Sequence, residues 1–173
     1  MKAVKILFIL AGILTVLSSC KKDTSDTSGT PTNVLFHSDF TSLTDLSVWS
    51  QSSGGEAIID SSAVKFTNIS DCYHFETINP IPVQKGKTYE LRIKGKVNES
   101  LSGDPMLCAG DFIVWVVQGS TNVISDSFGN HPAWTQRSFS FEATSSASVK
   151  IEFLIGTMRG AWIDSIDFLV IQK

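Results

Sequence analysis

The residues Thr88-Tyr89-Glu90-Leu91-Arg92-Ile93-Lys94 decide the fold class, because apolar and polar side chains alternate strictly along them. A period of two is typical of a β-strand that has one face in the core and one face in solvent. We expect Tyr89, Leu91 and Ile93 to form the core face of this strand. The stretch therefore predicts a sheet that is buried on one side.

The same alternation recurs in later segments, and no segment shows a sustained helical period. Residues 138–143 and 149–155 alternate in this way, and we expect them to pair as neighbours through the polar turn at 144–148. Further strands are predicted at Val34–Phe40, Ala57–Asp60, Val64–Asn68, Cys72–Val83, Asp111–Gln118 and Trp162–Ile171. Nine or ten short strands predict an all-β domain, a single jelly roll or β-sandwich of two antiparallel sheets.

The N-terminal twenty residues have the layout of an export signal. Two lysines precede an apolar run of twelve residues, Ile6–Leu17, and a helix that spans a bilayer needs roughly twenty. Leu17-Ser18-Ser19-Cys20 then resembles the lipobox of bacterial lipoproteins, in which the cysteine carries diacylglycerol. The resemblance implies a signal peptide at residues 1–19 and lipidation of Cys20, whereas an ordinary secretory signal is the alternative.

A polar segment follows the lipobox and separates it from the predicted domain. Residues 20–32 contain no large apolar side chain, so they predict a flexible tether in front of a domain at residues 33–173. The tether begins with Lys21 and Lys22, and it lacks the aspartate that would resemble an inner-membrane retention signal. We therefore expect an outer-membrane lipoprotein, on either the periplasmic or the cell-surface face.

Charge and cysteine content narrow the function classes. Without Lys2 and Lys5 the chain keeps twelve basic residues against seventeen acidic ones, a formal charge of −5. Binding to phosphates needs a basic field, so no nucleic-acid partner is expected. Cys72 and Cys108 are the other two cysteines besides Cys20, and in an oxidising compartment they either form a disulfide bond or stay as buried thiols.

Four stretches resemble, in this order, the carbohydrate-binding modules of families 4, 9 and 22 and their galactose-binding-like relatives. They are Asp39-Phe40 with Trp49, Gly54 and Gly55; Ile81–Leu91; Trp134–Phe141; and Gly160–Phe168. The resemblance rests on the order and spacing of the stretches, and it implies a β-sandwich that binds a polysaccharide or oligosaccharide. Most of these residues are expected to serve the fold, and we expect Trp134 to lie in the core.

No local catalytic signature appears in the chain. Gly-x-Ser-x-Gly, His-Glu-x-x-His, Cys-x-x-Cys and a phosphate-binding glycine loop are all missing from the sequence. We therefore expect a non-catalytic protein that binds glycan. A structural or adhesive surface module that binds protein is the second hypothesis, and a small jelly-roll enzyme acting on glycans is the third.

Trp115 is the predicted centre of a sugar site. Along Phe112–Gln118 the side chains that point to one face of the strand and those that point to the other are both mainly apolar. The face that lies outside the core is therefore not an ordinary polar exterior. If Phe112, Val114 and Val116 pack in the core, Trp115 stands on the outer face of the sheet, where the related modules carry their sugar cleft. The alternative buries Trp115 and turns the other parity outward.

Five further residues are candidates for the sugar site. Tyr73 and His74 are adjacent, so they face opposite ways, and one of them is expected to join Trp115. Arg92 and Gln118 are the candidate hydrogen-bonding partners for sugar hydroxyls. Trp49 is expected either to line a site at a loop end or to act as a structural plug.

The resemblance also implies a structural calcium ion. In the related modules an acidic residue near the first strand and the aspartate of the last-strand motif hold it, together with backbone carbonyls. Asp39 and Asp164 occupy those places, although Asp39 precedes Phe40 and thereby reverses the usual order. Asp164 lies within an apolar strand and needs a partner in any case, which a metal, an arginine or backbone amides would supply.

Replacing Cys20 with serine tests the lipid anchor, because the thiol is the atom that carries the lipid. We expect Cys20→Ser protein to move from the membrane fraction to the soluble fraction and to lose label from a radioactive fatty acid. Cys108→Ser protein is the control and should keep both properties. Label that persists on the Cys20→Ser variant would refute the assignment.

Overall fold

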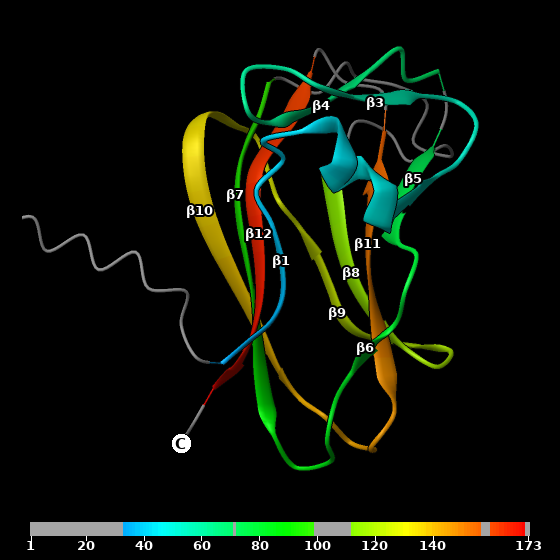
Figure 1. The fold of residues 1–173 in the computed structure, drawn as a ribbon, viewed down its shortest axis with the longest axis vertical. Coiled ribbons are helices and arrows are strands. Elements are labelled where there is room, and N and C mark those ends of the chain that lie inside the picture. Colours follow the sequence, from blue (N-terminus) through cyan, green and yellow to red (C-terminus); the bar gives the residue numbers. More distant parts are fainter. Residues whose placement is uncertain (1–32, 71, 99–111, 157–159, 172–173) are drawn as a thin grey trace, which may run out of the picture. The chain divides into compact units, whose positions relative to one another are not determined.

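The structure is a computed structural model that describes residues 33–70, 72–98, 112–156 and 160–171. These residues form two antiparallel β-sheets and one short 3-10 helix, η1 (Leu43–Val48) (Figure 1). The apolar faces of the two sheets enclose one hydrophobic core. The predicted all-β sandwich is therefore confirmed. Within the described residues, no helix is long and apolar enough to span a membrane.

The first sheet, called here the β7 sheet, has the strand order β10-β7-β12-β4-β3, and β1 also pairs with β12. Strand β12 has β7 along one edge, and it shares its other edge between β4 near its start and β1 further along. The strands of this sheet are β10 (His131–Glu142), β7 (Thr88–Val97), β12 (Ala161–Ile171), β4 (Val64–Thr67), β3 (Glu56–Ile59) and β1 (Val34–Ser38).

The second sheet, called here the β8 sheet, has the order β2-β5-β11-β8-β9, and β6 pairs with β11. Strands β8 and β9 form a hairpin in which Gly119 has a φ of +63°, a conformation that glycine adopts without steric cost. The strands of this sheet are β2 (Trp49–Gln51), β5 (Tyr73–Thr77), β11 (Ser148–Ile155), β8 (Phe112–Gln118), β9 (Thr121–Ser127) and β6 (Ile81–Pro82).

The structure corrects the predicted pairing of residues 138–143 with residues 149–155. The first segment belongs to β10, which pairs with β7, and the second is β11, which pairs with β5, β6 and β8. The two strands therefore lie in different sheets, and the turn between them connects the two layers. Phe141 and Val149 both face the core, but they approach it from opposite sides. Alternation predicts which side of a strand is buried but not which sheet contains that strand.

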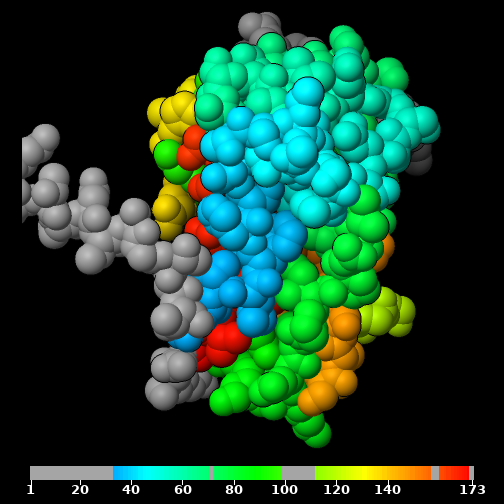
Figure 2. Space-filling view, viewed as in Figure 1, coloured from blue at the N-terminus to red at the C-terminus, as the bar shows by residue number. Residues whose placement is uncertain are grey.

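Aromatic rings fill the space between the sheets. Trp49 is 3% exposed and stacks on Phe75 with 4.6 Å between ring centroids. Tyr89 stacks on both Phe141 and Phe168, at 5.5 and 5.6 Å. Burying such large rings is a major source of folding free energy. Figure 2 shows the surface of the sandwich on the side of β1 and η1, whose blue and cyan residues lie between red residues of the last strand and green residues.

Trp49→Ala should destabilise the fold strongly, because the ring is buried and stacked in the core. A truncation of this kind costs roughly 3–5 kcal/mol of unfolding free energy, which urea denaturation of the full chain would measure. The control is Leu43→Ala in η1, where the side chain is 76% exposed and the expected change is within about 0.5 kcal/mol. Equal stability of the two variants would contradict the role of Trp49 in the core.

Candidate functional site

The β8 strand resolves the question of which way Trp115 faces. Phe112, Val114 and Val116 have at most 1% of their surface exposed and lie in the core, so Trp115 stands on the outer face, where it is partly exposed. Its indole Nε1 donates a hydrogen bond to Ser125 Oγ on β9 over 3.1 Å. This bond restricts rotation of the ring, which is therefore held ready on the surface of the sheet.

Two carboxylates lie beside Trp115 on the same outer face. Glu152 on β11 is the cross-strand partner of Trp115, and Glu76 on β5 is the cross-strand partner of Glu152. Like charges that face each other across strands repel, and each carboxylate has a basic neighbour of its own. His74 Nδ1 lies 2.5 Å from Glu152 Oε1, and Lys150 Nζ donates to Glu76 Oε1 over 2.9 Å.

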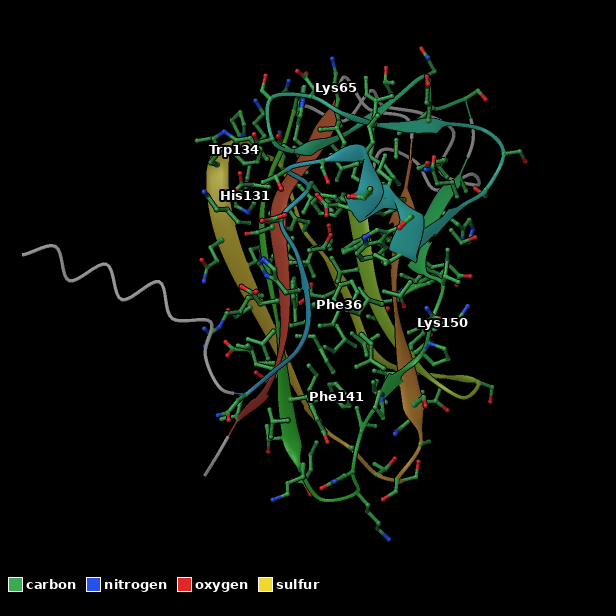
Figure 3. The ribbon with its side chains drawn as sticks, in the orientation of Figure 1. Phe36, Lys65, His131, Trp134, Phe141 and Lys150 are labelled. Carbon is green, nitrogen blue, oxygen red and sulfur yellow. The ribbon has the colours of Figure 1, made fainter. Side chains whose placement is uncertain are left out.

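We call this set of side chains the Trp115 face; it comprises Trp115, Ser125, Glu152, His74, Glu76 and Lys150. Figure 3 labels Lys150, which belongs to β11 in the middle of this sheet. The face combines one partly exposed aromatic ring with carboxylate, imidazole and ammonium groups. Such a surface can stack against apolar C–H groups and can hydrogen-bond to hydroxyl groups.

Tyr73 does not lie on the Trp115 face. Its side chain is fully buried in the core, and its hydroxyl donates a hydrogen bond to Gln51 Oε1 over 2.7 Å. Burial, followed by the nearby Glu56 charge, raises the pKa of Tyr73 to about 12. Because adjacent strand residues face opposite ways, His74 is the member of the pair that joins Trp115 on the outer face.

Trp49 and Gln118 do not lie on the Trp115 face either, because both are buried. Trp49 packs in the aromatic core, so it is the structural plug among the two predicted alternatives. Gln118 is 7% exposed, and its Nε2 donates to the backbone oxygen of Ser145 over 3.0 Å. Its amide therefore holds the turn after β10, a role that its apolar sequence neighbours did not indicate.

Arg92 lies on the other side of the sandwich from Trp115. It belongs to β7, where Leu91 and Ile93 face the core and Arg92 faces outward. Its Nε and Nη2 both donate to Glu90 Oε2, over 3.0 and 2.7 Å. The prediction that Arg92 joins the sugar site is therefore wrong, because the sequence could not show that β7 and β8 belong to different sheets.

The pairing with Arg92 makes Glu90 a source of pH-dependent stability. The Arg92 hydrogen bond, as the main cause, lowers the pKa of Glu90 below its ordinary value. A lowered pKa in the folded state means that the stabilisation is present above the unfolded pKa and is lost as the pH falls through the folded pKa. We therefore expect the unfolding free energy of the Glu90→Gln variant to decrease less on acidification than that of the unmodified protein. Urea denaturation at a series of acidic pH values would measure both decreases. An unchanged pH profile would contradict this role.

Asp39 and Asp164, the two predicted calcium ligands, each have a polar partner within the chain. Asp164 sits at a bulge in β12, and its carboxylate pairs with Lys94 Nζ at 2.7 Å. Asp39 accepts a hydrogen bond from the Thr41 hydroxyl over 3.1 Å. No group of three His, Cys, Asp or Glu side chains among the described residues could hold a metal ion. Calcium binding stays a prediction to which the structure adds no ligand.

The cysteines are only partly covered by the described residues. Cys72 is disulfide-bonded, in line with the oxidising compartment that an exported protein enters. Its predicted partner Cys108 lies outside the described residues, as does the predicted lipid attachment site Cys20.

Two tryptophans that the sequence analysis did not nominate lie on the outer face of the β7 sheet. Trp134, which we expected in the core, is 44% exposed. Trp134 has the same parity as Gln136 and Ser138, which face outward, whereas Phe139 and Phe141 face the core. Trp162 takes the outer parity of β12 between the buried Ala161 and Ile163. The alternation of residues along this strand could therefore have predicted from the sequence that Trp162 faces outward.

The described β-sandwich is similar in fold to solved structures of carbohydrate-binding modules. A module of Cellvibrio mixtus lichenase 5A in complex with cellotriose superposes with a TM-score of 0.54 at 11% identity, covering 80% of this chain and 99% of that chain. The N-terminal cellulose-binding domain of Cellulomonas fimi beta-1,4-glucanase C gives 0.52 at 14% identity, covering 72% and 88%. No family model matches the chain, and no curated protein matches it.

A third solved structure contains a catalytic module as well. The CBM22-1–GH10 modules of Clostridium thermocellum endo-1,4-beta-D-xylanase 10B, complexed with xylohexaose, give a TM-score of 0.56 at 13% identity, covering 82% of this chain and 29% of that chain. The similar structures are mainly non-catalytic carbohydrate-binding modules. At these low identities, the structural comparisons establish a shared β-sandwich fold and nothing more.

Proposed function

We propose that this protein binds a neutral polysaccharide or oligosaccharide on the Trp115 face and does not act on it as an enzyme. The observation that carries the proposal is the outward position of Trp115, where Ser125 holds its ring in place by a 3.1 Å hydrogen bond. The shared fold with carbohydrate-binding modules supports the same function.

The Trp115 face suits a sugar because it offers both kinds of contact that a sugar ring requires. The indole provides a flat apolar surface for the C–H groups, and its position is set before the ligand arrives, which lowers the entropic cost of binding. Glu152 lies opposite Trp115 on the next strand, His74 contacts Glu152, and both can hydrogen-bond to hydroxyl groups. Glu76 and Lys150 extend the polar surface to the next strand.

The balance of charges on this face favours a neutral ligand. The two carboxylates, Glu76 and Glu152, are each paired with a basic side chain. A strongly anionic or cationic ligand would have to compete with these pairs, whereas hydroxyl groups can share them through hydrogen bonds. The same pairing leaves neither carboxylate free, which supports binding over glycoside hydrolysis, a reaction that needs one acidic and one basic carboxyl group.

The cellular role follows from the N-terminal sequence features. We propose that a lipid on Cys20 anchors the protein in the outer membrane, on its periplasmic or cell-surface face, and that residues 20–32 form a tether to the domain. Several acyl chains hold a protein firmly on a membrane. A glycan-binding domain on such a tether would retain polysaccharide at the cell envelope for separate enzymes and transporters.

Trp115→Ala should abolish retention on a neutral polysaccharide while the protein stays folded. Loss of a central aromatic contact costs on the order of 2 kcal/mol, or about thirtyfold in affinity, and weak binding would then fall below detection. Affinity electrophoresis of the full-length protein against a panel of neutral glycans, including xylan and mixed-linkage β-glucan, would measure the loss.

Trp134→Ala is the matched control, because it removes an exposed tryptophan from the opposite sheet. This variant should keep its retention on the neutral glycan. Melting curves of both variants should stay close to that of the unmodified protein. Destabilisation of the Trp115→Ala variant by about 3–5 kcal/mol, the cost of truncating a core ring, would make Trp115 a packing residue and contradict the proposal.

A further inference from the structure

A second aromatic surface crosses the outer face of the β7 sheet. It consists of one side chain from each of four adjacent strands, and we call it the aromatic–lysine row: Trp134 on β10, Lys96 on β7, Trp162 on β12 and Lys65 on β4. Trp162 is the cross-strand partner of both Lys96 and Lys65. Figure 3 shows Trp134 and Lys65 at the same end of this sheet. The row thus alternates ring, ammonium, ring and ammonium.

Each ammonium group in the row lies over an indole ring. Lys96 Nζ is 4.3 Å from the ring centroid of Trp162 and 4.9 Å from that of Trp134. Lys65 Nζ is 5.6 Å from the Trp162 centroid. Attraction between a cation and an aromatic face holds such pairs together. The long lysine side chains are therefore positioned before any ligand binds, which reduces the entropy lost on binding.

Gly160 shows that the position of Trp162 is built into the backbone. A Cβ atom at residue 160 would lie 2.4 Å from Cη2 and 2.7 Å from Cζ3 of the Trp162 ring, which is far closer than carbon atoms approach. Glycine at this position therefore lets the ring come this close to the backbone of residue 160. The ring is consequently pinned between this backbone and the two lysine side chains.

The row carries positive charge that is not fully neutralised. Within the described residues, Lys65 has only a long ion pair with Asp60, at 3.8 Å, and Lys94 on the same sheet pairs with Asp164 at 2.7 Å. Among the described residues, no carboxylate forms an ion pair with Lys96. This contrasts with the Trp115 face, where each carboxylate has a basic partner. A ligand for the row therefore needs negative groups as well as apolar faces.

We propose that the aromatic–lysine row binds an acidic glycan, a chain whose sugar units carry carboxylate groups. Trp134, which is 44% exposed, stacks against a sugar ring, and Lys96 and Lys65 bind carboxylates. Three spacings between neighbouring strands of roughly 4.8 Å make the row about 14 Å long, so it contacts several sugar units. The alternation of rings and ammonium groups matches a chain in which each unit has both an apolar face and a carboxylate.

An anionic membrane is the competing partner for a surface of tryptophan and lysine. Membrane-binding surfaces insert apolar side chains into the boundary between headgroups and acyl chains. Here Lys96 lies between the two rings, and Trp162 is pinned against the backbone, so Trp134 is the only strongly exposed apolar side chain of the row. The row is suited to a flat chain that lies along it, and it offers little apolar surface for insertion.

The test measures binding of the full-length protein to polygalacturonate and alginate by affinity electrophoresis at low salt. Fully methyl-esterified polygalacturonate, which keeps the sugar backbone and loses the charge, is the matched ligand. We expect retention on at least one polyuronate, at least tenfold weaker binding of the ester, and a loss of tenfold or more with either Lys96→Gln or Trp134→Ala. Lys85→Gln, which removes an exposed lysine from a distant turn, should leave the retention unchanged.

Several results would overturn the proposal. Failure to bind either polyuronate, equal binding of the esterified polymer, or equal losses in Lys96→Gln and Lys85→Gln protein would each do so. Sedimentation with vesicles of anionic phospholipid, in the absence of polyuronate binding, would assign the row to a membrane instead. Trp115→Ala should not change polyuronate retention, so a failure of this inference is distinguishable from a failure of the neutral-glycan site. Melting curves of each variant would exclude unfolding as the cause of a loss.

Discussion

The stacked aromatic rings between the two sheets are the interaction on which the rest of the structure depends. Trp49 and Phe75 come from β2 and β5, whereas Tyr89 and Phe168 come from β7 and β12 of the opposite sheet. Neither sheet can bury its own rings, so each needs the other as a cover. The period of two in every strand then forces the alternate side chains outward. The core thereby determines which residues are available for binding on both outer faces.

The two outer faces differ in charge, and this difference separates their proposed ligands. On the β8 sheet, Trp115 lies beside carboxylates that are paired with basic side chains, a surface suited to uncharged hydroxyl groups. On the β7 sheet, Trp134 and Trp162 hold lysines against their rings. One sandwich thus presents a neutral polar surface and a cationic aromatic surface on opposite sides.

Residues of the candidate site were predictable only where local parity decided their position. Parity required His74 and Tyr73 to face opposite ways. Only the structure showed that Tyr73 and Phe112 are buried, which places His74 and Trp115 outside. Arg92 and Gln118 were misplaced for different reasons. Arg92 faces outward as its parity indicated, but β7 belongs to the other sheet. Gln118 sits at the end of an apolar strand, where its amide hydrogen-bonds to a turn that lies far along the chain.

The sequence by itself determined most of the strands and hence the β-sandwich class, because alternation is a local property of neighbouring side chains. It did not predict β2 or β9, and it left open which parity of Phe112–Gln118 is buried. The tertiary structure alone decided which strands pair, since hydrogen bonds between strands join segments that are distant in the sequence. It separated β10 from β11, which are joined by a short turn, and it placed β10 beside β7. The row of Trp134, Lys96, Trp162 and Lys65 arises from three such pairings, so no local pattern could reveal it.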